Sequence, residues 1–192
     1  MPPSTTVIQQ SEIPGEPGSA EVHRYSLEKV AKMKADFLQA ASSEDPPCVV
    51  GVSLELADSG PGIRTLALAT PNHVFNLSFR RPPSQAQKRI LQGLFSKVPH
   101  LTGFQFPHTI VLLAYALGCD ISGHDLSTID AGSMDPNSYM QSPGTLIAGQ
   151  VCLASRERIN ERWENGLSFS DTKSKDDALK SKCAVRAWFT AM

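Results

Sequence analysis

Residues 48–56 read CVVGVSLEL, an apolar run that contains one hydroxyl side chain, Ser53, and one carboxylate, Glu55. Its length and its β-branched valines are typical of a buried strand. A proline pair precedes the run and a DSGPG turn follows it, so both ends of the strand are marked. A carboxylate on a buried strand must be protonated or paired, and Glu55 therefore needs a partner elsewhere in the chain.

Two further β-like runs follow the first after short connections. They are IRTLALAT at 63–70 and HVFNLSF at 73–79, and only Pro71 and Asn72 separate them. Links this short join antiparallel strands, because a parallel pair needs a long crossover. The sequence therefore predicts an antiparallel meander of three strands.

Apolar residues at helical spacing predict the remaining elements. Ser26 is a plausible N-cap for the first helix, and a Pro/Ser start signal opens the second. A short strand is expected at 100–106, followed by a helix that holds Pro107 in its first turn and ends at Gly118. The helices are expected at 26–41, 80–98, 107–118, 145–163 and 175–192. This order indicates a mixed α/β domain, a sheet with helices packed on it.

Composition restricts the class of protein further. Residues 1–22 are rich in Pro, Ser, Gly and Glu, which predicts a flexible leader ahead of a single domain over 23–192. Hydrophobic residues make up 41% of the chain and charged residues 19%, as in globular proteins. No secretory signal and no apolar run of about 20 residues is visible, so we expect an intracellular protein, nuclear or cytoplasmic, without a membrane span.

Charge and reactive side chains exclude several functions. The net charge is −1, whereas dedicated nucleic-acid binders are more often basic. No phosphate-binding GxxxxGK[ST] loop or GxSxG elbow is present. The four cysteines form no CxxC pair, and the histidines are scattered, which is a poor zinc pattern. We therefore expect structural roles for His73, His100, His108 and His124.

Three strings occur in order on these elements: GVSLEL at 51–56, TGFQFPHTIVLL at 102–113 and KCAVRAW at 182–188. With RTLALATPNHVFNLSF at 64–79, they resemble the motifs of the DEDD 3′–5′ exonucleases, and most of all the branch of RNase D and the Werner-type exonuclease domain. The resemblance covers about residue 27 to the end of the chain. It implies a ribonuclease H-like fold, in which parallel strands extend the meander into a mixed sheet with helices packed on it.

Active members of that family hold two divalent metal ions, about 4 Å apart, between four acidic residues. At the matching positions this chain has Ser53 and Glu55 in the first motif, Thr109 in the second, and Lys182 and Arg186 in the third. One acid of four is kept, and Lys182 replaces the tyrosine that orients the attacking water. The resemblance therefore implies that the catalytic set is not intact and that no Mg²⁺ or Mn²⁺ cofactor is bound.

The replacement of an acid by Arg186 suggests the partner that Glu55 needs. A guanidinium fork can satisfy both oxygens of a carboxylate, and its permanent charge would take the electrostatic place of a lost metal ion. We therefore hypothesise that Arg186, on the last helix, pairs with Glu55. The alternative is that Glu55 lies at a solvated strand end and Arg186 on an exposed helix face.

These features predict an inactive exonuclease-like domain that works as an adaptor in RNA handling. The near-neutral charge favours protein partners, self-association among them, over weak binding of single-stranded nucleic acid. Trp188 and Phe189 fall at core spacing, which favours packing over base stacking. The basic residues that could contact a phosphate backbone are Arg80, Arg81, Lys88, Arg89 and Lys97 in one group, and Lys173, Lys175, Lys180 and Lys182 in another.

Two other interpretations stay open. The chain could be an active Mg²⁺- or Mn²⁺-dependent 3′–5′ exonuclease on RNA or DNA that uses substitute acids. Those candidates are Asp58, Asp120, Asp125, Asp176 and Asp177. Alternatively, the resemblance is coincidental and the chain is an unrelated α/β domain.

Overall fold

The structure is a computed structural model of the 192-residue chain. The residues that it describes are 4–8, 20–44, 49–57, 62–98, 100–103, 106–118, 161 and 175–191. The helix predicted at 145–163 and the loop before it fall outside these ranges, apart from residue 161.

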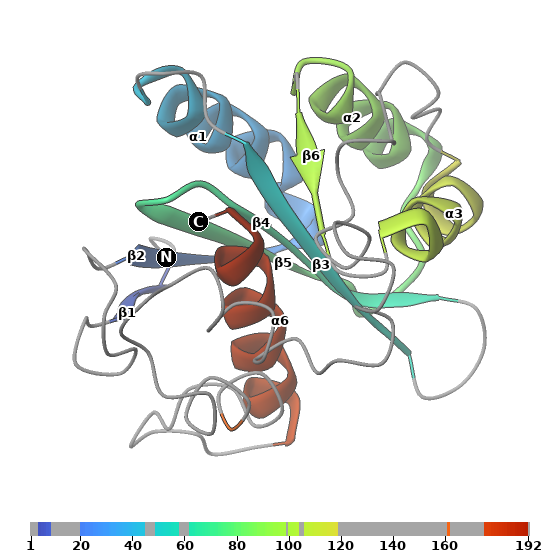
Figure 1. Cartoon of the computed structure of the whole chain (residues 1–192). Coiled ribbons are helices and arrows are strands. Elements are labelled where there is room, and N and C mark those ends of the chain that lie inside the picture. The colour runs from blue at the N-terminus through green and yellow to red at the C-terminus, as the bar shows by residue number, and fades with distance from the viewer. Residues whose placement is uncertain are drawn as a thin grey trace.

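The described part of the chain contains both strands and helices, with β3, β4 and β5 following one another directly (Figure 1). The strands are β1 (Ser4–Ile8), β2 (Ala20–Ser26), β3 (Val50–Leu56), β4 (Ile63–Ala69), β5 (His73–Ser78) and β6 (Leu101–Thr102). The helices are a 3-10 turn, η2 (Leu27–Lys29), and the α-helices α1 (Val30–Ser42), α2 (Gln85–Phe95), α3 (Phe106–Leu117) and α6 (Lys175–Ala191).

The six strands form one mixed sheet in the order β1-β2-β5-β4-β3-β6. β3, β4 and β5 pair antiparallel, with Glu55 opposite Thr65 and Thr65 opposite Ser78. β6 lies parallel to β3 on one side, and β2 lies parallel to β5 on the other. The predicted meander and its parallel extension are confirmed, and the chain has a mixed α/β fold.

Helices cover both faces of this sheet, and each face has its own apolar core. On one face, α1, α2 and α3 pack against alternate residues of the meander such as Val52, Leu66 and Leu77. On the other face, α6 packs against Ala67, Val74 and their neighbours. Figure 1 shows α1 and α2 together on one side of the sheet and α6 on the opposite side. The period-two alternation of strand side chains divides the two cores.

Local signals explain where the helices begin and end. Ser84 caps α2 with a capping box: its hydroxyl accepts from Gln87 N, and Gln87 Oε1 accepts from Ser84 N. Gly118 follows α3 with φ of 59°, the left-handed conformation that favours glycine at a helix end. The first predicted helix differs, because Leu27–Lys29 form a 3-10 turn and the Ser26 side chain makes no capping hydrogen bond.

Two predictions from the sequence were wrong. The flexible leader expected over 1–22 contains β1 and the first residues of β2, which pair with each other and with β5. Ala20 and Val22 are buried against α6, so the apolar core between α6 and the sheet includes residues of the expected leader. Of the strand expected over 100–106, the described residues form only β6 (Leu101–Thr102), and Phe106 already belongs to α3.

The third helix is less buried than its apolar sequence suggested. Ile110, Leu113 and Leu117 enter the core, whereas Val111 and Tyr115 are 64% and 73% exposed. The buried residues recur at helical spacing, so a single face of α3 contacts the core. No helix in the described ranges combines the length and the apolar character that crossing a lipid bilayer requires.

Candidate functional site

The first motif lies on β3, against α6. Gly51, Ser53 and Glu55 alternate along the strand and therefore share the face of the sheet that α6 covers. A Cβ atom on Gly51 would collide with the carbonyl oxygen of Ala187 and lie 2.8 Å from the backbone nitrogen of Ala191. The helix can approach β3 this closely because residue 51 has no side chain.

Arg186 and Glu55 form an ion pair across this contact. Arg186 Nη1 donates a hydrogen bond to Glu55 Oε1 over 3.2 Å, and the two side chains are only 21% and 20% exposed. The pairing predicted from the sequence is confirmed. A guanidinium thus places a fixed positive charge beside the Glu55 carboxylate.

Cys183 lies in the same layer, one turn before Arg186. It is fully buried, and its Sγ donates to the carbonyl oxygen of Ser53 at 3.3 Å. Burial raises the pKa of the Cys183 thiol to about 12. Cys183 is therefore a neutral packing residue, because the thiolate that a nucleophile or metal ligand requires is strongly disfavoured.

The residues present at these positions do not fit a pair of magnesium ions. Lys182 precedes Arg186 by four residues, so both cations lie on the same side of α6 as neighbours. One carboxylate beside two cations lacks the oxygen ligands that Mg²⁺ requires. Thr109 is buried in the first turn of α3, and within the described chain no hydrogen bond or ion pair joins it to Glu55 or Arg186.

The described residues give no contact between the substitute acids and this site. Asp58, Asp120 and Asp125 lie outside the described residues. Asp176 and Asp177 are in the first turn of α6, where the structure describes the backbone and not the side chains.

The predicted basic residues lie on elements from different layers. Arg80 and Arg81 follow β5, and Lys88 and Arg89 are in α2, which packs on the α1 face of the sheet. Arg81 lies 3.7 Å from the Glu28 carboxylate, and both side chains are exposed. Lys182 is on α6, on the opposite face. Lys97 follows α2 directly, Lys175 and Lys180 are in the first turns of α6, and Lys173 lies outside the described residues.

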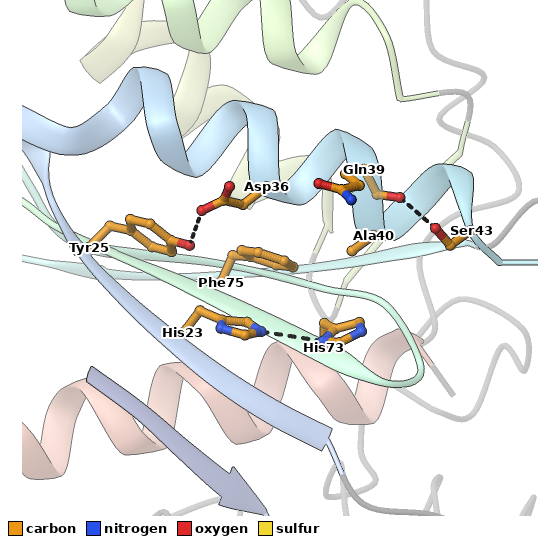
Figure 2. A pocket seen from close by; sticks show the side chains of 8 residues that line it. All are labelled: His23, Tyr25, Asp36, Gln39, Ala40, Ser43, His73 and Phe75. Carbon is orange, nitrogen blue, oxygen red and sulfur yellow. Dashed lines mark hydrogen bonds between the residues drawn. The ribbon is translucent and has the colours of Figure 1, made fainter. Parts of the chain in front are cut away.

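A pocket of about 350 Å³ opens between α1 and strands β2 and β5 (Figure 2). Its lining comprises His23, Tyr25, Asp36, Gln39, Ala40, Ser43, His73 and Phe75. The His23 ring stacks on Phe75 with centroids 4.9 Å apart, and Tyr25 donates a hydrogen bond to Asp36 over 2.7 Å. Figure 2 shows the two histidine rings side by side beneath α1.

Protonation in this pocket follows from burial and from the Tyr25–Asp36 hydrogen bond. Burial raises the pKa of Tyr25 well above its usual range, and the bond to Asp36 adds to the effect. Burial also acts to raise the pKa of Asp36, but hydrogen bonds from Tyr25 and Lys32 outweigh it, and the pKa lies below its usual value. Tyr25 is therefore a neutral donor and Asp36 an ionised acceptor.

Three side chains beside this pocket could hold a metal ion: Glu21, His23 and His73. The sequence interpretation did not find them, because it placed Glu21 in a flexible leader and treated the histidines as scattered. His23 and His73 are fifty residues apart and meet only because β2 pairs with β5. The signal that could have found them is the Glu-x-His spacing at 21–23, which puts both side chains on one face of a strand.

No protein-family model matches the chain, and no curated protein is significantly similar to it in sequence.

Proposed function

We propose that this chain is a catalytically inactive relative of the DEDD 3′–5′ exonucleases, with their ribonuclease H-like fold, and that it acts as a binding module in RNA handling. The observation that carries the proposal is the 3.2 Å ion pair between Arg186 and Glu55. It lies where the motif resemblance would place the metal-binding acids. A guanidinium there pairs with one oxygen of the carboxylate and opposes the entry of divalent cations.

The arrangement of the sheet supports this assignment. The strand with Ser53 and Glu55 begins an antiparallel meander and pairs on its other side with a parallel strand, β6. The helix with Lys182 and Arg186 packs directly on that first strand. These are the relationships that the motif resemblance requires of its first and third motifs.

The charge distribution favours a protein partner over a nucleic acid. The chain has a net charge of −1, and its two predicted basic groups are on elements that pack on opposite faces of the sheet. Arg81 already has Glu28 within 3.7 Å. A phosphate backbone is bound by cations along one continuous path, so we propose weak nucleic-acid binding at most. The proposed partners are proteins of an RNA-handling complex, with a second copy of this chain among them.

A nuclease assay tests the loss of catalysis. The full-length chain is incubated with 5′-labelled single-stranded RNA or DNA and either Mg²⁺ or Mn²⁺. We expect no shortening from the 3′ end above that seen with the Glu55→Gln variant. Shortening that Glu55→Gln abolishes would show an active exonuclease and overturn the proposal.

A binding assay tests the choice of partner. Fluorescence anisotropy with labelled single-stranded RNA is expected to give weak affinity that falls steeply with salt. Sedimentation of the full-length chain over a range of concentrations measures self-association in the same buffer. Tight RNA binding that persists at physiological salt would contradict the preference for protein partners.

A further inference from the structure

Glu21, His23 and His73 come together because two parallel strands are in register. β2 and β5 pair with Glu21 opposite His73 and His23 opposite Phe75. Residues two apart on a strand face the same way, so Glu21 and His23 lie on the same face of the sheet as His73. His23 and His73 line the pocket under α1, on the opposite face from Gly51, Glu55 and α6.

The three ligand atoms form a compact triangle. His23 Nε2 lies 3.3 Å from His73 Nδ1 and 3.6 Å from Glu21 Oε2, and His73 Nδ1 lies 4.0 Å from the same Glu21 oxygen. The point in the plane of these three atoms that is equally far from all of them lies about 2.1 Å from each. This distance equals the bond length of Zn²⁺ to imidazole nitrogen or carboxylate oxygen. One divalent ion can therefore bind all three atoms after small side-chain rotations.

We propose that Glu21, His23 and His73 form a Zn²⁺ site that fastens β2 to β5. Two imidazoles and one carboxylate suit a borderline divalent cation such as Zn²⁺, whereas Mg²⁺ and Ca²⁺ prefer oxygen ligands alone. Three protein ligands leave one tetrahedral position for water or for a small ligand in the pocket. This site does not depend on the proposed function, because none of its ligands contacts Glu55 or Arg186.

The His23 ring and the backbone of His73 are held in place before a metal ion binds. The His23 ring stacks on Phe75 at an interplanar angle of 26°, which limits its rotation. The His73 backbone nitrogen donates to Thr70 Oγ1 at the start of β5. Glu21 is 52% exposed, so its carboxylate can move toward the ion without disturbing the core. Because the His23 ring is already restricted, it loses little conformational entropy when a metal ion binds.

Without metal, the two nitrogens can stay 3.3 Å apart only if a hydrogen lies between them. A Zn²⁺ ion replaces that hydrogen bond, and each ring then carries its proton on the other nitrogen. The geometry thus provides two imidazole nitrogens and one carboxylate as ligands.

Calorimetric titration of Zn²⁺ into the chelator-treated full-length chain tests the proposal. We expect one equivalent to bind, and we expect His23→Gln or His73→Gln to weaken binding by about 100-fold. The control is His100→Gln, which removes an exposed histidine and is expected to leave the affinity unchanged. Equal affinity in the wild type and both histidine variants would overturn the proposal, because the ion would then bind elsewhere, for example at the cysteines.

Spectroscopy of the wild type keeps the test independent of how the variants fold. Co²⁺ bound in place of Zn²⁺ is expected to give visible d–d absorption without a thiolate-to-cobalt charge-transfer band. X-ray absorption of the Zn²⁺ complex is expected to fit nitrogen and oxygen neighbours only. A sulfur neighbour in either experiment would assign the metal to a cysteine and contradict the site.

Discussion

Arg186 and Glu55 are 131 residues apart in sequence, and their side chains meet at 3.2 Å between α6 and β3. The Glu55 carboxylate lies on a strand that is otherwise mostly apolar. The Arg186 guanidinium comes from the helix that covers that face of the sheet. A pair of this kind contributes to stability mainly because removal of either side chain leaves the opposite charge half-buried without this contact.

The first prediction concerns the strength of this pair. Glu55→Gln and Arg186→Met are each expected to lower the free energy of unfolding by about 1–3 kcal/mol, because each removes the ion pair from a half-buried position. A double-mutant cycle measured by urea unfolding is expected to give a coupling of about 1–2 kcal/mol.

The matched control for this cycle is the pair of Arg81 and Glu28, which is 3.7 Å apart and exposed. Its coupling is expected to be about 0–0.5 kcal/mol, since water screens both charges. If the two pairs gave the same coupling, the Arg186–Glu55 pair would have no structural role beyond that of a surface contact.

The second prediction concerns the close approach of α6 to β3. Gly51→Ala places a Cβ against Ala187 and within 2.6 Å of Thr190 Oγ1, so the helix must move away from the strand. We expect a loss of about 3 kcal/mol or more in the free energy of unfolding, at the upper end of the cost of overpacking.

Gly62→Ala is the control for this substitution, because among the described residues its Cβ would meet only Ala57 Cβ, at 3.8 Å. We expect a change within about 0.5 kcal/mol there. Thermal or urea unfolding of both variants provides the comparison. Equal stability of Gly51→Ala and the wild type would mean that α6 does not pack on β3 as described.

The third prediction concerns pH. The pKa of His23 lies below its usual 6.5, because burial and the neighbouring His73 oppose its charged form more than Glu21 and Asp36 favour it. The unfolded chain therefore binds more protons than the folded chain between pH 6.5 and the lower folded value. Stability should accordingly fall as the pH drops through this window.

Urea unfolding at pH 7.5 and 5.5, with a chelator present, measures this effect. His23→Phe keeps an aromatic ring beside Phe75 and removes the titrating group. Its unfolding midpoint is expected to fall less on acidification than that of the wild type. An identical fall in both proteins would show that the titration of His23 does not cause the loss of stability at low pH.

The fourth prediction concerns the hydrogen bond from Tyr25 to Asp36. Tyr25→Phe removes a donor at 2.7 Å from the carboxylate, with an expected loss of about 1–2 kcal/mol in stability. The pKa of Asp36 should rise in this variant, because one of the hydrogen bonds that lower it is gone. Carboxyl NMR shifts of Asp36 against pH measure the change.

Tyr115→Phe is the control, since Tyr115 on α3 is 73% exposed. It is expected to change neither the stability nor the Asp36 titration. An Asp36 titration curve in Tyr25→Phe that is identical to that of the wild type would show that the hydrogen bond does not lower the carboxyl pKa.

The elements that the sequence predicted correctly carry local signals. The meander strands lie between turns of a few residues, α2 begins with a capping box, and α3 ends at a glycine with positive φ. Because each signal spans only a few residues, it does not depend on the rest of the fold. The pairing of Arg186 with Glu55 was predictable because the motif resemblance assigned both residues to one site.

The features that sequence reasoning missed depend on contacts between distant segments. β1 and β2 lie on either side of a Pro- and Gly-rich segment, and their pairing with each other and with β5 is not visible in local composition. The pocket and the cluster of Glu21, His23 and His73 exist only once β2 pairs with β5. Likewise, nothing in the sequence at 101–106 indicates that Phe106 begins α3 and does not extend β6.

Titration of Mg²⁺ into the full-length chain by calorimetry tests most directly whether the ion pair has replaced the metal centre. Mg²⁺ is the suitable probe, because it disfavours the imidazoles of His23 and His73. We predict no binding heat at micromolar to low-millimolar Mg²⁺ and a trace indistinguishable from that of Glu55→Gln. Two Mg²⁺ ions bound per chain, and lost in Glu55→Gln, would contradict the account.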